Sequence, residues 1–429
     1  MPKFRAAASR LAFAAALATT AAAGMTVAAT PAFAQKKEKE APAAKANYSK
    51  PFVAVYQPIA KVLSANGDVA ALKPQIPSIV AAATTPDDKF AAGQIVFNIG
   101  AKTSDVAVQR QGLDMMLDSG KTAPADLARN SFAAAQLAYN AKDMPQARLR
   151  AEQAIAAGYT GDAELIIAET YFAENNTAAG LAAIEKAVAR KNAANQPVPE
   201  QWIKRALAQA YQGKLAAETS KYAMLYARNY PSVTSWGDAI AIQRNTYNYE
   251  GQELLDLLRL ASRAGAMRYE RDYADYVEAA DARRLPGETQ RIIDAGIAAG
   301  KLKANNVFVS EARTIASGRV KADMADLPAL ERDAKAAGGT AATAMAAGDA
   351  LLSYNQPAKA EEFYKLALTR PGVDAARVNT RLGIAQTDQG KTAEAQATFA
   401  KVTGPRQAIA QLWSVYAGQK GGTTVAAAN

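Results

Sequence analysis

The sequence predicts an all-α protein, an α-solenoid of stacked helical hairpins, and three observations support this prediction. Alanine is abundant and runs of β-branched residues are few, so the summed helix propensity is favourable. No stretch shows the sustained period-two alternation of apolar and polar residues that half-buried strands produce. Short breakers such as Ser119-Gly120-Lys121 and Asn175-Asn176-Thr177 divide the chain into pieces of one helix length. Because a solenoid grows by stacking, 429 residues need not divide into separate domains.

Residues 1–34 have the features of a secretory signal peptide. Lys3, Arg5 and Arg10 precede an apolar run from Leu11 to Ala29, and Ala32-Phe33-Ala34 supplies the small residues of a cleavage site. The alternative is a transmembrane anchor, which a run of barely 19 residues rich in Ala and Thr disfavours. We therefore expect a periplasmic or secreted protein with no membrane span after cleavage.

The rest of the chain divides into four parts. Residues 35–50 are expected to form a flexible linker of mixed charge. Residues 51–340 are expected to form a divergent array of helical hairpins, although 303–339 is hard to interpret. Residues 341–420 should hold two clear repeats and a capping helix from Gln407 to Tyr416. Residues 421–429 are expected to be a disordered tail.

The two clear repeats share one pattern at a spacing of 35 residues, from Gly348 to Gly383. In each repeat a Gly on a first helix is followed twelve residues later by an Ala on a second helix, and then four residues later by an aromatic residue. The first repeat has Gly348, Ala360 and Tyr364, and the second has Gly383, Ala395 and Phe399. Small residues suit a close approach of two helices, and the aromatic fills the space beside them. Such a short unit needs a neighbour to bury its apolar face.

This pattern resembles the tetratricopeptide repeat, whose period is about 34 residues. Leu382-Gly383, Gly390, Ala395 and Phe399 match that repeat well, and weaker copies of the frame surround Ala135, Ala168 and Leu207-Ala208. The resemblance covers about half of the chain. It implies a right-handed superhelix in which the first helix of each hairpin lines a concave groove. It also implies that the groove binds a protein or peptide partner.

The residues that would face this groove can be assigned one hairpin at a time. They are Arg129, Phe132, Gln136, Tyr139 and Asn140 in one hairpin, Leu165, Glu169 and Phe172 in the next, and Trp202, Arg205, Gln209 and Gln212 in a looser third copy. Aromatic rings, arginines and amides are the groups that a peptide or glycan groove uses. In the alternative interpretation, the three aromatic residues Phe132, Phe172 and Trp202 fill the space between neighbouring hairpins.

Tyrosines are concentrated between residues 222 and 276. Tyr222 and Tyr226 share one helical face by their spacing, as do Tyr269, Tyr273 and Tyr276. The spacing is typical of core residues. The alternative is a platform for carbohydrate or peptide, with several arginines nearby in the sequence.

The composition excludes most catalytic chemistry. The sequence contains no Cys and no His, which excludes Ser-His-Asp and Cys-His catalysis and zinc sites built from thiolates or imidazoles. Three pairs of acids remain as candidates for acid–base chemistry: Glu361-Glu362, Glu270 with Asp272, and Glu253 with Asp256. Each pair is better explained as a solvated helix face. We therefore expect a protein that is not an enzyme and has no cofactor and no metal.

The charge leaves two functions open. The formal net charge is +10, and removal of Lys3, Arg5 and Arg10 leaves +7. A protein scaffold with an ordinary solvated surface explains this charge, which is spread along the chain. The alternative is a module that associates with an anionic cell-wall polymer or polysaccharide. We expect no nucleic-acid partner, and a glycosidase that works with carboxylates alone is the least favoured third possibility.

Overall fold

The computed structural model describes residues 46–65, 67–249 and 251–421, and within them it is all-helical, with no strand. The all-α prediction is therefore confirmed for the described residues. The signal peptide, most of the expected linker and all but the first residue of the expected tail lie outside them. By contacts the chain divides into two units, residues 1–48 and 49–429. Of the first unit, only residues 46–48 are described, and they have no regular secondary structure.

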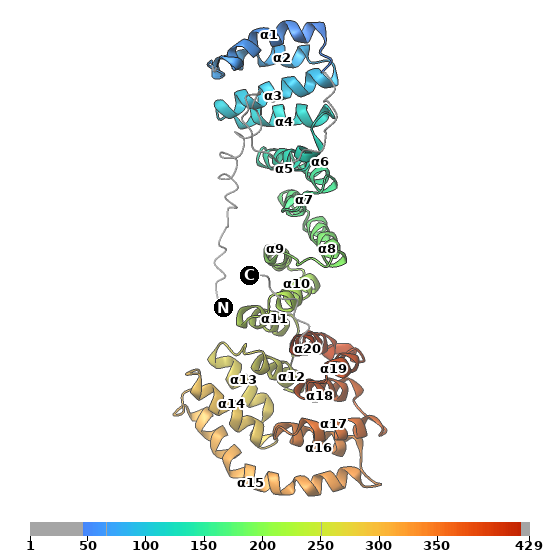
Figure 1. The fold of residues 1–429 in the computed structure, drawn as a ribbon. Helices are drawn as coiled ribbons and strands as arrows, with labels where there is room; N and C mark the ends of the chain where they lie inside the picture. Colours follow the sequence, from blue (N-terminus) through green and yellow to red (C-terminus); the bar gives the residue numbers. More distant parts are fainter. Residues whose placement is uncertain (1–45, 66, 250, 422–429) are drawn as a thin grey trace, which may run out of the picture. The chain divides into compact units, whose positions relative to one another are not determined.

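Twenty α-helices and two short 3₁₀ helices follow one another along the described residues (Figure 1). The first ten are α1 (Lys50–Ser64), α2 (Ile76–Ala82), α3 (Pro86–Lys102), α4 (Val106–Asp118), α5 (Pro124–Asn140), α6 (Met144–Ala156), α7 (Ala163–Ala173), α8 (Thr177–Ala193), α9 (Glu200–Gln212) and α10 (Ala216–Asn229). The second ten are α11 (Val233–Thr246), α12 (Gly251–Arg263), α13 (Glu270–Ala280), α14 (Pro286–Ala298), α15 (Val307–Lys335), α16 (Ala341–Ser353), α17 (Pro357–Leu368), α18 (Ala375–Asp388), α19 (Thr392–Phe399) and α20 (Gln407–Lys420). The 3₁₀ helices are η1 (Ala70–Gln75) and η2 (Gly404–Arg406). Each helix from α2 onward packs against the next.

The turns between these helices fall at the predicted breakers. Lys142 and Asn175 adopt positive φ angles of 61° and 60° between α5 and α6 and between α7 and α8. Asp374 caps α18 by accepting a hydrogen bond from the amide of Arg377, and Asp105 caps α4 by accepting from the amides of Ala107 and Val108. Asp162 precedes α7 without capping it.

The two clear repeats fold as the Gly and aromatic pattern predicts. Gly383 on α18 lies against Phe399 on α19, so closely that a Cβ atom at Gly383 would be 2.4 Å from the ring. Gly348 on α16 lies in the same way against Tyr364 on α17, with a corresponding distance of 2.7 Å. The same glycine–aromatic contact therefore closes both hairpins.

The segment that the sequence left unexplained is one long helix. Helix α15 has 29 residues and includes Gly318 and Pro328, both of which are helix breakers by propensity. It packs against α14 and α16, with Val309, Ala316 and Leu327 among its buried residues. The expected array of short hairpins is therefore interrupted at 307–335, because tertiary packing at several points holds one helix together.

The last helix returns to the middle of the chain. Helix α20 packs against α10, α12 and α18 as well as α19, and Figure 1 shows it beside α10 and α12. Trp413 and Tyr416 of α20 belong to one core cluster with Trp236 and Leu257. The segment from α10 to α20 thus closes on itself, whereas α3 to α9 pack mainly against their neighbours in sequence.

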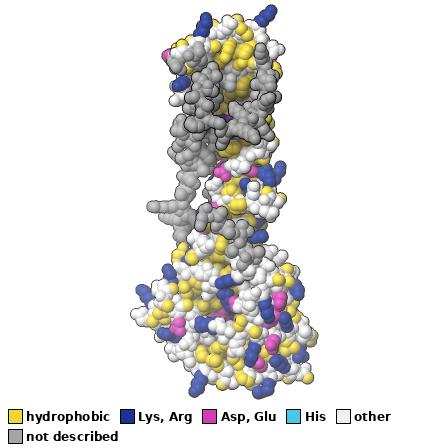
Figure 2. Space-filling model, in the orientation of Figure 1, with side chains coloured by type: hydrophobic (Ala, Val, Ile, Leu, Met, Phe, Trp, Pro, Cys, Tyr) yellow, Lys and Arg dark blue, Asp and Glu magenta, His cyan; other side chains and the backbone are white. Residues whose placement is uncertain are grey.

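Half of the eight tyrosines between residues 222 and 276 are core residues. Tyr222, Tyr226, Tyr273 and Tyr276 are buried, which confirms the core interpretation for them, while Tyr247 and Tyr269 are exposed. On the face shown in Figure 2, Lys and Arg side chains are scattered, with acidic side chains between them. This dispersion agrees with an ordinary solvated surface.

Candidate functional site

Three of the predicted groove positions meet on three helices. Glu169 on α7 and Arg205 on α9 form a bidentate ion pair, in which Arg205 Nη2 donates to Glu169 Oε2 at 2.7 Å and Nε donates to Oε1. Tyr139 on α5 lies near both charges. Burial and the negative charge of Glu169 raise the pKa of its hydroxyl, and the positive charge of Arg205 lowers it. Because α5, α7 and α9 are the first helices of successive hairpins, the cluster crosses three repeats.

Two further predicted residues complete this cluster. With its amide oxygen turned toward Arg205, Gln209 accepts a hydrogen bond from Arg205 Nη1 at 3.0 Å. The ring of Phe172 lies beneath the guanidinium, with 5.5 Å from Arg205 Cζ to the ring centroid. Phe172 itself is buried, so it supports Arg205 from below and offers little surface to a ligand. We call Tyr139, Glu169, Phe172, Arg205 and Gln209 the inner-helix cluster.

The remaining predicted residues take other positions. Trp202 is only 1% exposed and donates from Nε1 to Asp162 Oδ1 at 3.0 Å, so its assignment to the groove is wrong. Phe132 stacks on Tyr159 at 4.2 Å between ring centroids and is also a packing residue. The space-filling interpretation therefore holds for both rings, because each one finds a partner on the neighbouring hairpin.

The other positions on these helices differ in exposure. Leu165 is buried, Gln136 is half-buried, and Arg129, Asn140 and Gln212 are exposed. Arg129 pairs with Asp126 one turn before it on α5. Asn140 lines an open recess of about 730 Å³ between α4 and α5, together with Arg110, Asp114, Met115 and Leu137. Asn140 and Gln212 thus offer amide groups to the solvent, and the recess beside Asn140 lies between α4 and α5.

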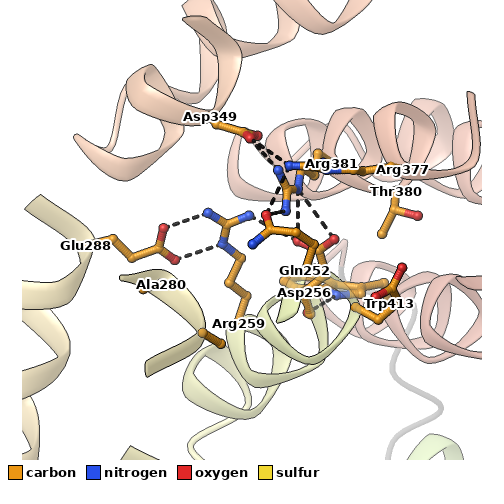
Figure 3. Close-up of polar contacts among 12 residues, drawn as sticks. Gln252, Asp256, Arg259, Ala280, Glu288, Asp349, Arg377, Thr380, Arg381 and Trp413 are labelled. Carbon is orange, nitrogen blue, oxygen red and sulfur yellow. Dashed lines mark hydrogen bonds and ion pairs between the residues drawn. The ribbon is translucent and has the colours of Figure 1, made fainter. Parts of the chain in front are cut away.

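A second polar cluster, which the sequence analysis missed, lies inside the closed segment. Arg259 on α12 donates to both carboxylate oxygens of Glu288 on α14, at 2.8 and 2.6 Å, and to Asp256 at 3.1 Å (Figure 3). Tyr276 adds a hydrogen bond to Glu288 at 2.7 Å. All four side chains are buried. We call these residues, with those of the next paragraph, the buried charge network.

Helices α16 and α18 supply the other half of this network. Arg381 lies between Asp256 and Asp349, pairs with both, and donates to Gln252 Oε1 at 2.6 Å (Figure 3). Arg406 also pairs with Asp256, and Tyr364 donates to Asp349 at 2.9 Å. Side chains from the four helices α12, α14, α16 and α18 thus meet in one network of ion pairs.

The network keeps its acids ionised. Burial alone raises the pKa of Asp256, but Arg381, Arg406 and Arg259 together lower it below the usual value. For Glu288 burial acts in the same direction, and Arg259 overcomes it, so that its pKa falls to about 2. Asp256 and Glu288 therefore each carry a negative charge that arginines neutralise.

The acids of this network were expected to lie on solvated helix faces. Asp256 is fully buried, and Glu361, from another candidate pair, is 3% exposed and pairs with Lys365 and Lys391. That expectation is wrong for both residues. The available signal was a charged residue inside an apolar first helix: Asp349 follows Gly348 directly, and Arg381 precedes Leu382.

No family model matches the chain, and no curated protein matches it. Among the described helices none is long and apolar enough to cross a membrane. The resemblance to tetratricopeptide repeats therefore rests on the residues and contacts given above.

Proposed function

We propose that this chain is an exported, non-enzymatic scaffold that holds a protein or peptide partner on the face of α5, α7 and α9. In this proposal the hairpins form a right-handed superhelix of the tetratricopeptide type, and this face is its concave groove. The observation that supports it most directly is the inner-helix cluster. Glu169 and Arg205, both chosen from the repeat frame alone, form an ion pair between α7 and α9, and Tyr139 on α5 lies near enough for both charges to act on the pKa of its hydroxyl.

The chemistry of this face suits an extended peptide. Exposed Asn140 and Gln212, with half-buried Gln136 and Gln209, offer amide groups that can donate to and accept from a peptide backbone. Arg205 and Tyr139 add flat surfaces at the centre. Arg205 is already oriented by Glu169 and Phe172, so a ligand would lose little entropy by ordering it.

The corresponding face of the last repeats is unsuitable for a ligand. Helices α12 and α18 direct Asp256, Arg259 and Arg381 toward one another, and these three side chains are fully buried. A partner could enter there only by breaking buried ion pairs, at a cost of several kcal/mol. The repeats that match the family best therefore stabilise the array, and binding belongs to the earlier hairpins.

The same network argues against catalysis by carboxylates. A general acid that works near neutral pH needs a raised pKa, whereas arginine charges lower the pKa of Asp256 and of Glu288 despite their burial. Neither acid is open to a substrate. With no His and no Cys in the sequence, binding is the better supported function.

The test is affinity capture by the mature chain, beginning at Gln35, from a membrane and periplasm extract of its own host. Retained proteins are identified by mass spectrometry for the wild type, Tyr139→Ala and Arg205→Ala. The proposal expects one defined protein that the wild type retains in moderate salt and that both variants lose. Circular dichroism checks that each variant is folded.

Arg148→Ala is a matched control for Arg205→Ala. Arg148 on α6 also forms a bidentate pair with a glutamate, Glu174, and it also lies over an aromatic ring, that of Tyr171 at 4.6 Å. It belongs to a second helix, outside the proposed groove. Equal loss of capture in Arg148→Ala and Arg205→Ala would contradict the groove assignment, since both would then act through stability.

The alternative is association with a cell-wall polymer or anionic polysaccharide. The net positive charge favours it, as does Tyr269, which is exposed beneath Arg268 at 5.5 Å from Arg268 Cζ to the ring centroid. It predicts that the mature chain cosediments with purified sacculi at low salt and is released as salt rises. Absence of cosedimentation at low salt would contradict binding to the cell-wall polymer.

A further inference from the structure

The guanidinium of Arg205 in the inner-helix cluster has almost no hydrogen-bonding capacity left. Its Nε and Nη2 atoms donate to the two carboxylate oxygens of Glu169. With its amide oxygen turned toward Arg205, Gln209 accepts from Nη1 at 3.0 Å and from Nη2 at 3.3 Å. These contacts engage the Nε–H, both N–H groups of Nη2 and one N–H of Nη1. Of the five N–H donors of arginine, one on Nη1 therefore remains for a ligand.

One face of this guanidinium is covered by Phe172. Cζ of Arg205 lies over the Phe172 ring, 5.5 Å from its centroid. The ring in turn packs against the backbone of α8, because a Cβ atom at Gly180 would be only 2.2 Å from Cε1 of Phe172. Phe172 is buried, whereas the Arg205 side chain is 37% exposed. The open part of the guanidinium is therefore the face turned away from Phe172.

A carboxylate or a phosphate does not fit this arrangement. Such a group binds arginine best through two parallel N–H donors, and Arg205 has already given that pair of donors to Glu169. Glu169 also neutralises the charge that would attract a second anion, and its own negative charge would repel that anion. An acidic residue of a partner could bind in the plane of the guanidinium only by displacing Glu169, whose side chain is 10% exposed.

An aromatic ring fits the open face. Guanidinium groups are planar and weakly hydrated, and they stack on aromatic rings. Arg205 meets this requirement without rearrangement, since Glu169 and Gln209 hold its donors and Phe172 supports its other face. A surface that is already ordered costs a ligand little entropy. The flat face of Arg205 thus favours a flat apolar group over a charged one.

We propose that the partner places an aromatic side chain on the open face of Arg205, so that Phe172, the guanidinium and the partner's ring form one stack. The inference rests on the proposed scaffold function and adds a specificity to it. At this position the groove selects an aromatic residue and rejects an acidic one, although the net positive charge of the chain alone would favour anionic partners.

The test begins with the selection of random short peptides displayed on phage, against the mature chain beginning at Gln35 and against its Arg205→Lys variant. Lysine keeps the positive charge and removes the flat face. We expect the peptides enriched by the wild type to share one aromatic position, and those enriched by Arg205→Lys to lack it. Enriched peptides without an aromatic residue, or with a shared Asp or Glu in its place, would overturn the inference and leave the scaffold function standing. No enrichment over the empty support would contradict both.

Fluorescence anisotropy then compares one enriched peptide with two variants, in which Leu or Asp replaces the shared aromatic residue. On the wild type the Leu variant should bind about fivefold more weakly, and the Asp variant more weakly still. Arg205→Lys should weaken the aromatic peptide about fivefold and the Leu variant much less. Equal weakening of both peptides, or equal binding of all three by the wild type, would overturn the stack, and this second comparison needs no variant protein.

Arg148→Lys is the matched control. Arg148 on α6 also pairs with a glutamate and lies over an aromatic ring, but it is outside the proposed groove. The control should bind all three peptides as the wild type does, and circular dichroism verifies that both variants are folded. Loss of the aromatic preference in Arg148→Lys would contradict the assignment of the stack to Arg205.

Discussion

Arg381 and Asp256, 125 residues apart in the sequence, form an ion pair with both side chains fully buried. The pair joins α18 to α12, and Arg406 adds a second arginine to the same carboxylate. Trp413 of α20 donates to the main-chain carbonyl of Asp256 at 2.9 Å. Residue 256 therefore links α12 to α18, to η2 and to α20.

Asp256→Asn should destabilise the protein strongly. The substitution leaves Arg259, Arg381 and Arg406 buried with too few carboxylates, and breaking a buried pair from one side costs about 3–5 kcal/mol. Urea unfolding measures the free energy. Asp126→Asn is the control, since its exposed pair with Arg129 contributes little. A similar small effect of both substitutions would show that the network does not hold the segment closed.

Stability should fall in acid through Glu288. Its pKa is about 2 in the folded protein against an ordinary value of 4.5, so the folded state favours the ionised form. The stabilisation is complete above about pH 4.5 and is lost as the pH falls toward 2. A shift of this size corresponds to roughly 3 kcal/mol.

Glu288→Gln tests this assignment by urea unfolding at pH 7 and pH 3. The variant should be less stable than the wild type at pH 7, because Arg259 loses one of its two charged partners. It should then lose less stability between the two pH values, since the titrating group is gone. An unchanged acid dependence would assign the effect to other carboxyls, such as Glu361, whose pKa is also lowered to about 2.

The sequence predicts those parts of the fold that depend on residues close together in the chain. The turns at Lys142 and Asn175 and the start of α20 at Gln407 follow from nearby residues, and so do the glycine contacts of the last two hairpins. Helix α15 does not, because Gly318 and Pro328 argue against a helix that only packing at distant points maintains.

The candidate site likewise contains residues that local periodicity predicts and residues that it does not. The repeat frame placed Glu169 and Arg205 correctly on facing helices, since both follow a local periodicity. It could not separate an exposed position from a buried one, and so it assigned Trp202 to the groove. The sequence marks Arg381 only as a charged residue beside Leu382, and it does not show that Asp256 is its partner, because the two residues are 125 positions apart.

Gly383→Ala should destabilise the last hairpin. The new Cβ would lie 2.4 Å from the Phe399 ring, and overpacking of this kind costs about 1–3 kcal/mol. Phe399→Leu in the same chain should recover part of that loss, and a double-mutant cycle measures the coupling. Gly338→Ala serves as control, because a Cβ there meets no atom within 4 Å. Additive effects of the two substitutions would contradict the proposed contact.

Trp202→Ala and Tyr139→Ala should separate packing from binding. Trp202 is 1% exposed, and its loss leaves a cavity and removes the donor to Asp162, so we expect a cost of about 3–5 kcal/mol in urea unfolding. Tyr139 is half-buried and should cost clearly less. Partner capture should show the opposite ranking when it is measured under conditions where both variants remain folded: Tyr139→Ala should lose more binding than Trp202→Ala. Tyr139→Ala loses the partner because its ring lies on the proposed face, while Trp202→Ala retains it. If Trp202→Ala lost the partner while still folded and Tyr139→Ala kept it, the binding face would have to lie elsewhere on these hairpins.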